Sequence, residues 1–392
     1  MKISIYIHKI IYKFGGTESF TAKFLEITQD LYPAAEISLI TEVFKKRDGL
    51  TAQQMIERLN GAYGTSITSD NFSVRYINAA EPKPCRNIVE RILRKCNAVF
   101  FQKKLCTATK CDDLFVNCSN QSVIGSAARN ITIIHFPQDR KENSGIYKTI
   151  PFLKVFARKN DLKYFHCYEY FLPNSQFTAY WLKQKWQIPS ERICVCYPPI
   201  TLLTPVENKN MFQIFACGRI EASKKIDVMI KAFNSSEYLV KNCTFIVAGS
   251  CDNEDTKYID YIKSISGNNI RIIQNPSRVE LENLYAESGI FWHAKGYGET
   301  NPMLMEHFGM TTVEAMSAGC IPVVINKGGQ KEIVTQDCGY TWDEPEQLVS
   351  HTEQLLKNSE KIAEMRKACI ERSKICSKES FKKNIQNIFA LR

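Results

Sequence analysis

The sequence predicts an α/β protein with two domains, each built on a doubly wound parallel sheet. Short apolar runs alternate with stretches of helical periodicity along most of the chain. With 392 residues and 44% hydrophobic content, the chain is long enough for two domains of about 150 to 200 residues each. Within residues 290–334 a strand, a glycine turn and a helix start occur twice in succession. This repeat is typical of parallel sheets that bind ligands at the carboxyl ends of their strands.

Residues 290–334 also hold the strongest candidate for a binding site. The apolar runs 290–292 and 321–325 predict two buried strands, and Gly309 predicts the turn that begins a helix between them. The spacing of Thr311 and Glu314 predicts a capping box for that helix. A helix start beside a strand end directs backbone N–H groups and the positive end of the helix dipole towards an anion. A diphosphate suits such a site best.

The second helix of this stretch has equally simple signals. Gly319 predicts the end of the first helix, and Gly328 with Gly329 predicts a loop that opens another helix at about Gln330. The stretch therefore offers two helix starts at one edge of the predicted sheet.

Two carboxylates lie beside this predicted anion site. Glu306 follows the first strand, and Glu314 lies in the first turn of the helix. A carboxylate next to phosphate is electrostatically unfavourable, so the pair indicates hydrogen bonds to ligand hydroxyls, such as those of a sugar. The alternatives are that Glu314 only closes the capping box and that Glu306 is a solvated loop residue.

The segment from Glu306 to Glu314, EHFGMTTVE, resembles the E-x7-E motif of retaining nucleotide-sugar glycosyltransferases of group 1 (family 4). These enzymes have the GT-B architecture, two Rossmann-like domains that face each other across a cleft. The flanks AMSAGCIPVV and GGQKEIV, the segments 217–219 and 245–249, and Gly15-Gly16-Thr17-Glu18 are similar to the same family. The resemblance covers nearly the whole chain in the right order.

The resemblance implies a set of site residues. Glu306 would bind sugar hydroxyls, Glu314 the ribose, and His135 the sugar or acceptor. The implied catalytic residues are Glu306, His135, Arg219 and Lys224. The implied donor-binding residues are Gly15, Gly16, Arg219, Lys224, His307, Phe308, Gly309, Met310, Thr311 and Glu314.

Arg219 and Lys224 follow a predicted strand and form a second cationic signal. Arginine offers a bidentate donor and lysine a point charge, a combination that stabilises a leaving diphosphate. Both could instead be ordinary surface cations. Lys225 replaces the glycine that commonly follows this lysine in the family, which leaves the backbone geometry of the loop open.

His135 ends a predicted strand at 131–134 and begins the sequence His-Phe-Pro. The carboxyl end of a parallel strand is where open α/β sheets bind ligands, whereas most histidines are structural. His-Phe-Pro also resembles the His-Tyr-Pro of eukaryotic lipid-linked-oligosaccharide mannosyltransferases of this group.

The predicted domains are an acceptor-binding domain at 1–204, a nucleotide-sugar-binding domain at 205–370 and a helix at 371–392 that returns to the first domain. Residues 1–200 contain 28 Lys and Arg against 17 Asp and Glu, a net charge of +11, and the remaining residues have a net charge of −1. This asymmetry favours an anionic partner of the first domain, although ordinary surface lysines are the alternative. A basic amphipathic helix at 86–107 suits either an anionic lipid surface or a packed core.

Cysteine and metal signals are weak. Fifteen cysteines are scattered without C-x-x-C pairs, which favours a reducing cytosol, and no Asp-x-Asp metal motif occurs. Residues 1–16 are too interrupted by Lys9 and Lys13 for a signal peptide, and no run reaches the roughly 20 apolar residues of a membrane span. We expect a cytoplasmic protein that can contact the anionic membrane face.

The sequence thus predicts a retaining, metal-independent hexosyltransferase that uses a nucleoside-diphosphate sugar, needs no cofactor and binds no nucleic acid. Its acceptor would be a glycan or lipid-linked glycan in cell-surface polysaccharide or glycolipid synthesis. A sugar-nucleotide epimerase or phosphorylase of the same fold and a non-catalytic sugar-nucleotide-binding subunit remain open alternatives.

Overall fold

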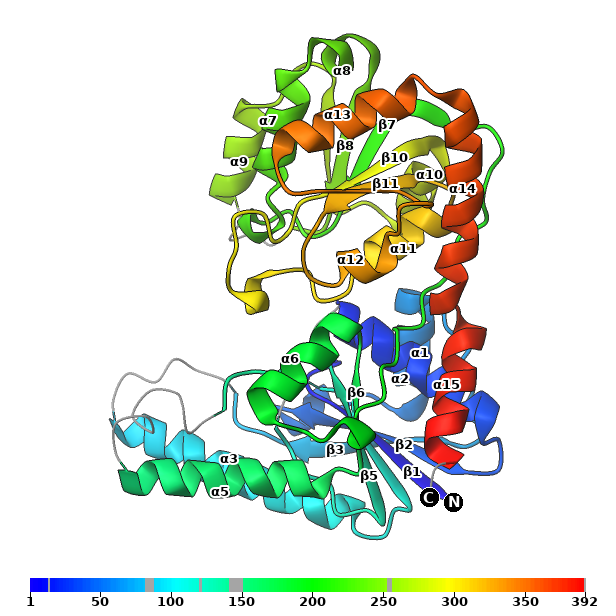
Figure 1. Cartoon of the computed structure of the whole chain (residues 1–392). Coiled ribbons are helices and arrows are strands. Elements are labelled where there is room, and N and C mark those ends of the chain that lie inside the picture. The colour runs from blue at the N-terminus through cyan, green and yellow to red at the C-terminus, as the bar shows by residue number, and fades with distance from the viewer. Residues whose placement is uncertain (13–14, 82–87, 120–121, 141–150, 252–255, 391–392) are drawn as a thin grey trace. The chain divides into compact units, whose positions relative to one another are not determined.

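The computed structural model describes residues 1–12, 15–81, 88–119, 122–140, 151–251 and 256–390. The chain divides into two compact units (Figure 1). Unit 1 contains Met1–Asn174, Thr178–Pro199 and Lys382–Arg392, and unit 2 contains Ser175–Phe177 and Ile200–Phe381. The sequence placed the first boundary after 204 and the returning helix at 371–392, whereas the chain enters unit 2 at Ile200 and re-enters unit 1 at Lys382.

Unit 1 contains a six-stranded sheet in the order β3-β2-β1-β4-β5-β6, in which every pair is parallel. Its strands are β1 (Lys2–Ile7), β2 (Glu36–Val43), β3 (Phe72–Asn78), β4 (Leu114–Asn117), β5 (Arg129–Ile134) and β6 (Tyr170–Pro173). Its helices are α1 (Gly16–Leu31), η1 (Lys46–Asp48), α2 (Ala52–Tyr63), α3 (Ile88–Thr109), α5 (Pro151–Cys167), α6 (Gln176–Trp186) and η3 (Ser190–Arg192).

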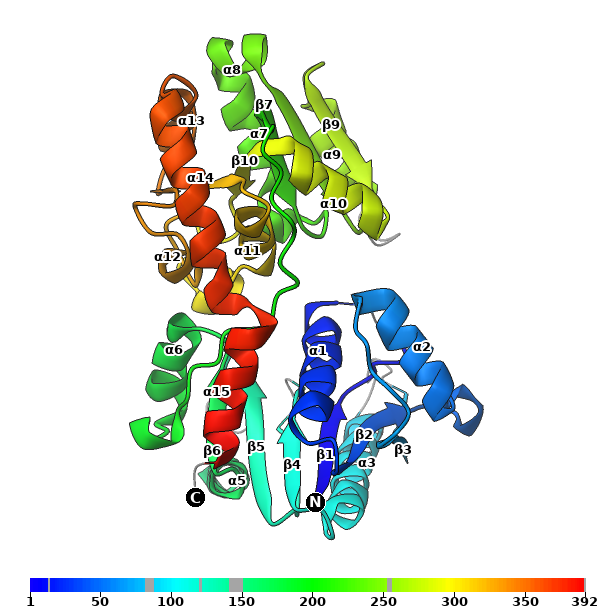
Figure 2. The same cartoon turned by 90° about the vertical axis from the view of Figure 1, so that its right-hand side faces the viewer.

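The last helix, α15 (Lys378–Ala390), packs beside α1 (Figure 2). The ring of Phe389 contacts the rings of Phe24 and Tyr32, and its carbonyl accepts a 2.7 Å hydrogen bond from Arg129 at the start of β5. Residues nearly 260 positions apart along the chain are thereby held together. The apolar face of α15 thus completes the core of unit 1.

Unit 2 contains a second all-parallel sheet, in the order β12-β11-β10-β7-β8-β9. Its strands are β7 (Asn210–Cys217), β8 (Thr244–Gly249), β9 (Ile270–Gln274), β10 (Ser288–His293), β11 (Ile321–Ile325) and β12 (Tyr340–Trp342). Its helices are η4 (Ala222–Lys224), α7 (Ile226–Ser235), α8 (Glu237–Asn242), α9 (Thr256–Ser264), α10 (Arg278–Glu287), η5 (Pro302–Leu304), α11 (Met310–Ser317), α12 (Gln330–Ile333), α13 (Pro345–Leu356), α14 (Ser359–Ser373) and η6 (Lys374–Cys376).

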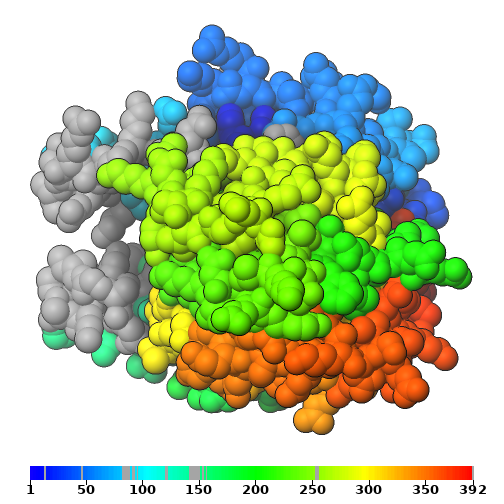
Figure 3. All heavy atoms as spheres, turned by 90° about the horizontal axis from the view of Figure 1, so that it is seen from above, coloured from blue at the N-terminus to red at the C-terminus, as the bar shows by residue number. Residues whose placement is uncertain are grey.

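The central strand β10 is buried on both faces, as its uninterrupted apolar sequence predicts. Phe291 contacts Phe215 and Tyr285, whereas its neighbour Trp292 points to the opposite face and contacts Phe245. The indole of Trp292 also donates a 3.0 Å hydrogen bond to Thr352 of α13. Helices α7, α8 and α13 lie side by side over this second face (Figure 3). The strand ends of this sheet are therefore fixed by packing from two sides.

No helix in the described ranges combines the length and apolar character needed to cross a bilayer.

Candidate functional site

The candidate site of unit 2 lies at the carboxyl ends of β7, β8 and β10. The ends of β7 and β8 approach so closely that a Cβ atom on Gly249 would lie 1.6 Å from the carbonyl oxygen of Gly218. Only glycine fits at position 249, and Gly218 itself has φ +156°. This close approach directs the loop after β7, which carries Arg219 and Lys224, along the edge of the sheet.

Glu306 lies at the centre of a cluster of cationic and imidazole side chains. Its Oε2 is 3.0 Å from Nζ of Lys224, 3.8 Å from Nζ of Lys295 and 3.5 Å from Nε2 of His293. Lys224 comes from η4, whereas His293 is the last residue of β10 and Lys295 lies two residues beyond it. Two lysines around one carboxylate leave a positive excess at this edge of the sheet.

The pKa values follow from this crowding. Burial opposes ionisation of Glu306, but Lys224, His293 and Lys295 together hold the pKa of its carboxyl well below its usual range. Burial lowers the pKa of His293 and that of Lys295, and Glu306 opposes both shifts. The cluster therefore contains an ionised carboxylate and a neutral imidazole at neutral pH.

Glu314 is held by two neighbours, and the predicted capping box is wrong. Gly309, not Thr311, is the N-cap of α11, with φ +121° and no side-chain cap. One carboxylate oxygen of Glu314 accepts a 3.1 Å hydrogen bond from the hydroxyl of Tyr285, and the other lies 3.4 Å from Arg278. The capping-box alternative for Glu314 thus fails, because the helix begins at a glycine with positive φ and not at a side-chain cap.

The helix start itself brings several predicted residues together. Gly309, Met310 and Thr311 form the first turn of α11, so their backbone N–H groups lie at its positive end. The side chain of Phe308 is buried in the core, so only its backbone can meet a ligand. Burial, assisted by Lys295, lowers the pKa of His307 to about 4, which keeps it neutral at neutral pH.

Two further signals from the sequence are confirmed. Gly319 follows the end of α11 with φ +82°, and a strand occupies Ile321–Ile325 as predicted. The helix expected at Gln330 begins there but has only four residues.

Arg219 is less enclosed than Lys224. Its side chain is 63% exposed and pairs with Glu221 at 3.1 Å. The neighbouring Lys225 adopts φ 56° and ψ 38°, the left-handed conformation that glycine favours, and its Nζ pairs with Glu299 at 2.8 Å. The loop therefore keeps the backbone of a glycine-containing turn, with a lysine at the strained position.

In unit 1, the predicted residues belong to the loops after β1 and β5. Gly15 is the N-cap of α1 and Gly16 is its first residue. The Nε2 atom of His135 lies 3.2 Å from the carbonyl of Cys118, and its ring meets Phe20 of α1 edge-on. Burial lowers the pKa of His135. His135 is thus a neutral, partly enclosed imidazole beside the first turns of α1.

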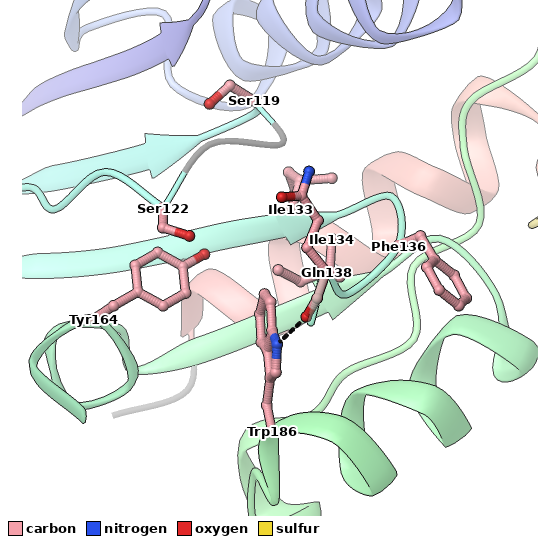
Figure 4. Close-up of a pocket in the computed structure, with 8 residues that line it drawn as sticks. All are labelled: Ser119, Ser122, Ile133, Ile134, Phe136, Gln138, Tyr164 and Trp186. Carbon is pink, nitrogen blue, oxygen red and sulfur yellow. Dashed lines mark hydrogen bonds between the residues drawn. The ribbon is translucent and has the colours of Figure 1, made fainter. Parts of the chain in front are cut away.

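A small hollow lies near the same strand ends, between β5, α5 and α6 (Figure 4). Tyr164 and Trp186 contribute its aromatic walls, and Ser119, Ser122 and Gln138 its polar groups. The indole of Trp186 donates a 2.8 Å hydrogen bond to the carbonyl of Gln138. Tyr164 and Trp186 therefore line this hollow as packed aromatic side chains.

Sequence reasoning missed four residues that contact the two motif carboxylates: His293, Lys295, Arg278 and Tyr285. His293 and Lys295 directly follow a predicted strand, the same signal that singled out His135. Arg278 carried no local signal, because it lies 36 positions before Glu314. Within the residues that the structure describes, no three His, Cys, Asp or Glu side chains are grouped as a metal site.

Comparison with protein families and curated proteins shows what this chain is similar to. Residues 204–375 match the family model described as "Glycosyl transferases group 1". A mouse GDP-Man:Man(3)GlcNAc(2)-PP-Dol alpha-1,2-mannosyltransferase is 26% identical over 183 residues, covering 42% of this chain and 35% of the relative. The Xenopus tropicalis protein of that name is 29% identical over 182 residues, with the same coverage. The matches thus span about a third of the length of these relatives.

Solved structures extend the similarity to both units. Alr3699/HepE of Anabaena in complex with UDP superposes with a TM-score of 0.69 and 16% identity, covering 100% of each chain. A sucrose-phosphate synthase from Thermosynechococcus elongatus has a TM-score of 0.70 and 12% identity, covering 99% of this chain and 98% of that one. At such identities the likeness shows the fold, which is GT-B with two Rossmann-like sheets as predicted. Residues 204–375 therefore resemble the glycosyl transferases group 1 family, within a chain of GT-B fold.

Proposed function

We propose that this chain is a retaining, metal-independent glycosyltransferase. It moves a hexose-type sugar from a nucleoside-diphosphate sugar, bound by unit 2, to a glycan or lipid-linked glycan bound by unit 1. The product belongs to cell-surface polysaccharide or glycolipid synthesis, and no cofactor is needed. The observation that carries the proposal is the cluster of Lys224, Lys295 and Glu306 beside the first turn of α11.

The cluster suits the charge changes of glycosyl transfer. Breaking the bond between sugar and phosphate leaves negative charge on the departing diphosphate, which nearby cations and N–H groups stabilise. Lys224, Arg219 and the N–H groups of Gly309 to Thr311 supply these donors in the proposal. The ionised Glu306 accepts hydrogen bonds from hydroxyl groups of the sugar, because a carboxylate is an acceptor only. Glu314, held by Tyr285 and Arg278, accepts those of the ribose.

GDP-mannose is the donor to test first. The curated relatives, at 24–29% identity, are named GDP-Man mannosyltransferases, whereas structures in complex with UDP are 11–16% identical. The same names support an acceptor that is a lipid-linked oligosaccharide rich in mannose.

Incubation of the purified protein with GDP-mannose and a mannose-terminated glycan tests the proposal. We expect release of GDP, a mannosylated product with the α anomeric configuration, and full activity in EDTA. UDP-glucose serves as the comparison donor. An inverted product, or a complete loss in EDTA that manganese restores, would contradict the retaining or the metal-independent part of the proposal.

The two other classes give different results in the same assay. An epimerase alters the sugar of the donor without any acceptor, and a phosphorylase needs inorganic phosphate to do so. A non-catalytic subunit binds GDP-mannose and leaves it intact. Incubation of donor alone, donor with phosphate and donor with acceptor therefore distinguishes the transferase from an epimerase, a phosphorylase and a non-catalytic subunit.

Contact with an anionic membrane is part of the proposal, at the cytoplasmic face. Four apolar side chains of α3 are more than half exposed: Val89 at 59%, Leu93 at 57%, Val99 at 56% and Phe100 at 62%. Lys103 and Lys104 on the same helix are exposed as well. The apolar side of this helix is therefore not used for core packing at these positions, and basic amphipathic helices bind anionic lipid surfaces.

Sedimentation with vesicles tests the membrane contact. We expect binding to vesicles that contain phosphatidylglycerol, reversal by high salt, and weaker binding when Leu93 and Phe100 are changed to Ser. The matched control is Tyr261→Ser, an exposed aromatic side chain of unit 2. Equal binding to neutral vesicles, or no binding to either, would exclude the docking while leaving the donor site untouched. We also expect charge reversal at Arg91, Arg94 and Lys95 to weaken the binding. The side chains of Arg91 and Lys95 lie outside those that the structure describes.

A further inference from the structure

In unit 1, a buried carboxylate that the sequence did not single out occupies a strand end. Glu42 is the penultimate residue of β2, and His8 directly follows β1. β1 lies between β2 and β4, at the point where the strand order of this sheet reverses. Open α/β sheets bind ligands outside the carboxyl ends of the strands at such a switch point.

Glu42 is joined to two side chains through one oxygen. Tyr6 donates a 2.6 Å hydrogen bond to Oε1, and Nδ1 of His8 lies 2.7 Å from the same atom. The contact from His8 is close and polar, although it is not a linear hydrogen bond. Glu42 is only 4% exposed, whereas the side chain of His8 is 25% exposed. The carboxylate is thus enclosed and the imidazole reaches the surface.

This arrangement fixes how the imidazole can act. A carboxylate only accepts hydrogen bonds, so the contact favours the tautomer of His8 that carries its proton on Nδ1. Tyr6 remains a donor to the carboxylate, because burial and Glu42 raise the pKa of its hydroxyl well above the ordinary value. The remaining nitrogen, Nε2, then offers a lone pair. Among the residues that the structure describes, Nε2 of His8 has no recorded partner.

The loop that carries His8 is held in place from two sides. Lys9 has φ 59°, a left-handed conformation that a non-glycine residue adopts at a cost. Tyr12 stacks on Phe44 in the loop after β2, and its hydroxyl donates to Asp48. Arg58 of α2 donates a 2.6 Å hydrogen bond to the carbonyl of Ile11. The imidazole is therefore preorganised, which lowers the cost of binding a ligand.

His8 differs in this respect from His135, the histidine that the sequence favoured. The Nε2 atom of His135 already faces the carbonyl of Cys118, and Phe20 packs against its ring. The Nε2 atom of His8 has no such contact among the residues that the structure describes.

We propose that the His8–Glu42 dyad binds a hydroxyl group of the acceptor sugar, which donates its hydrogen bond to Nε2 of His8. The dyad positions the acceptor and forms no covalent bond. The inference rests on the proposed function, because it specifies the acceptor site of that reaction. Glu42 acts through His8 and is a positioning residue, with Tyr6 holding its carboxylate.

The binding itself is tested by nitrogen NMR on protein labelled with 15N-histidine, with methyl α-D-mannopyranoside as the probe. We expect one imidazole resonance to shift as the mannoside is added. That resonance is absent in His8→Gln, and its shift is reduced in Glu42→Gln. A shift caused by inorganic phosphate and not by the mannoside would overturn the proposal, because it would mean that a protonated His8 binds anions.

The role in transfer is tested by kinetics. In His8→Ala we expect the KM for the acceptor to rise at least tenfold, with the affinity for GDP unchanged. His8→Gln should show a smaller rise in KM, because its amide can form a hydrogen bond near the position of Nε2. The matched control is His166→Ala, since His166 is an exposed histidine of α5 in the same unit. Thermal melting of each variant checks that it folds.

The two failures are distinguishable. A mannoside-induced shift of His8 in a wild-type protein that transfers no sugar would contradict the proposed function and leave the hydroxyl site intact. Normal transfer by wild type with His8→Ala equal to His166→Ala would overturn the acceptor inference alone.

Discussion

Glu306 in unit 2 and Glu42 in unit 1 are two enclosed carboxylates whose negative charges are stabilised by different sets of partners. Glu306 has two lysines and an imidazole within 4 Å, so its charge is more than balanced. Glu42 has a phenol and a single imidazole. An isolated buried carboxylate would be costly, and each site offsets that cost with partners of a different kind.

The difference in the charge around the two carboxylates indicates what each site can bind. The surplus of cations around Glu306 attracts a ligand with several negative charges, such as a diphosphate. With a neutral imidazole, the group around Glu42 carries only the charge of its carboxylate and exposes one nitrogen, which suits a neutral hydroxyl group and not an anion. In our proposal, this difference in charge distinguishes a donor-binding unit from an acceptor-binding unit. The following variants test that distinction, from the largest expected effect to the smallest.

The largest effect is expected from the cations of unit 2. Lys224→Ala should lower turnover of GDP-mannose by about 100-fold, because a charge-assisted donor to the leaving diphosphate is lost. Arg219→Ala should also remove most turnover, by about tenfold, since the side chain is more exposed. GDP release measures both. Lys231→Ala, an exposed lysine paired with Asp227, is the control, and near-normal rates in both site variants would remove the donor assignment.

The carboxylates of unit 2 should differ from each other. Glu306→Gln replaces an acceptor with a mixed amide, so kcat should fall by about tenfold or more while free GDP binds within about threefold of wild type. Glu314→Gln should show the reverse and weaken GDP by about tenfold. Titration calorimetry with GDP and the transfer assay separate the two. Wild-type behaviour of both variants would make the pair structural.

His307 predicts how stability depends on pH. Its pKa is about 4 in the folded protein and about 6.5 when unfolded, so the unfolded state binds more protons between these values. Stability should therefore fall as the pH drops from 6.5 towards 4. We expect wild type to lose about 1–2 kcal/mol more than His307→Asn between pH 7 and pH 5, as measured by urea unfolding. Equal losses would show that His307 titrates normally.

The smallest effect is expected at Lys225. Lys225→Gly should relieve the left-handed backbone, worth about 1 kcal/mol, but it removes the pair with Glu299, worth about 0–1 kcal/mol. The net change should be within about 1 kcal/mol of wild type. Lys225→Ala keeps the strain and also loses the pair, so it should be the less stable variant in thermal unfolding. The opposite order would mean that the backbone is unstrained.

Much of unit 2 is predictable because its signals are local. Uninterrupted apolar runs predicted β10 and β11, and glycines predicted the start and end of α11. Each of these signals depends on only a few adjacent residues. The sequence motif also identified Lys224 and Glu306, which contact each other across 82 positions. The capping-box prediction failed because the N-cap of α11 is Gly309, two residues before the predicted cap Thr311.

The dyad of unit 1 was not predictable in the same way. His8 and Glu42 carry no shared motif, and their contact depends on the register that pairs β1 with β2. The apolar residues of 86–107 have core spacing, yet Val89, Leu93 and Phe100 are exposed, because periodicity identifies a face and not what covers it. The assigned roles of the site residues remain predictions that the variants above test.

The most direct test of the donor unit is the transfer of mannose itself. Purified protein is incubated with GDP-mannose labelled in the sugar and with a mannose-terminated glycan, beside Lys224→Ala. We expect one mannose transferred per GDP released, with the α configuration, and about 100-fold less product from the variant. No transfer from GDP-mannose or UDP-sugars, together with no binding of GDP or UDP, would contradict the assignment.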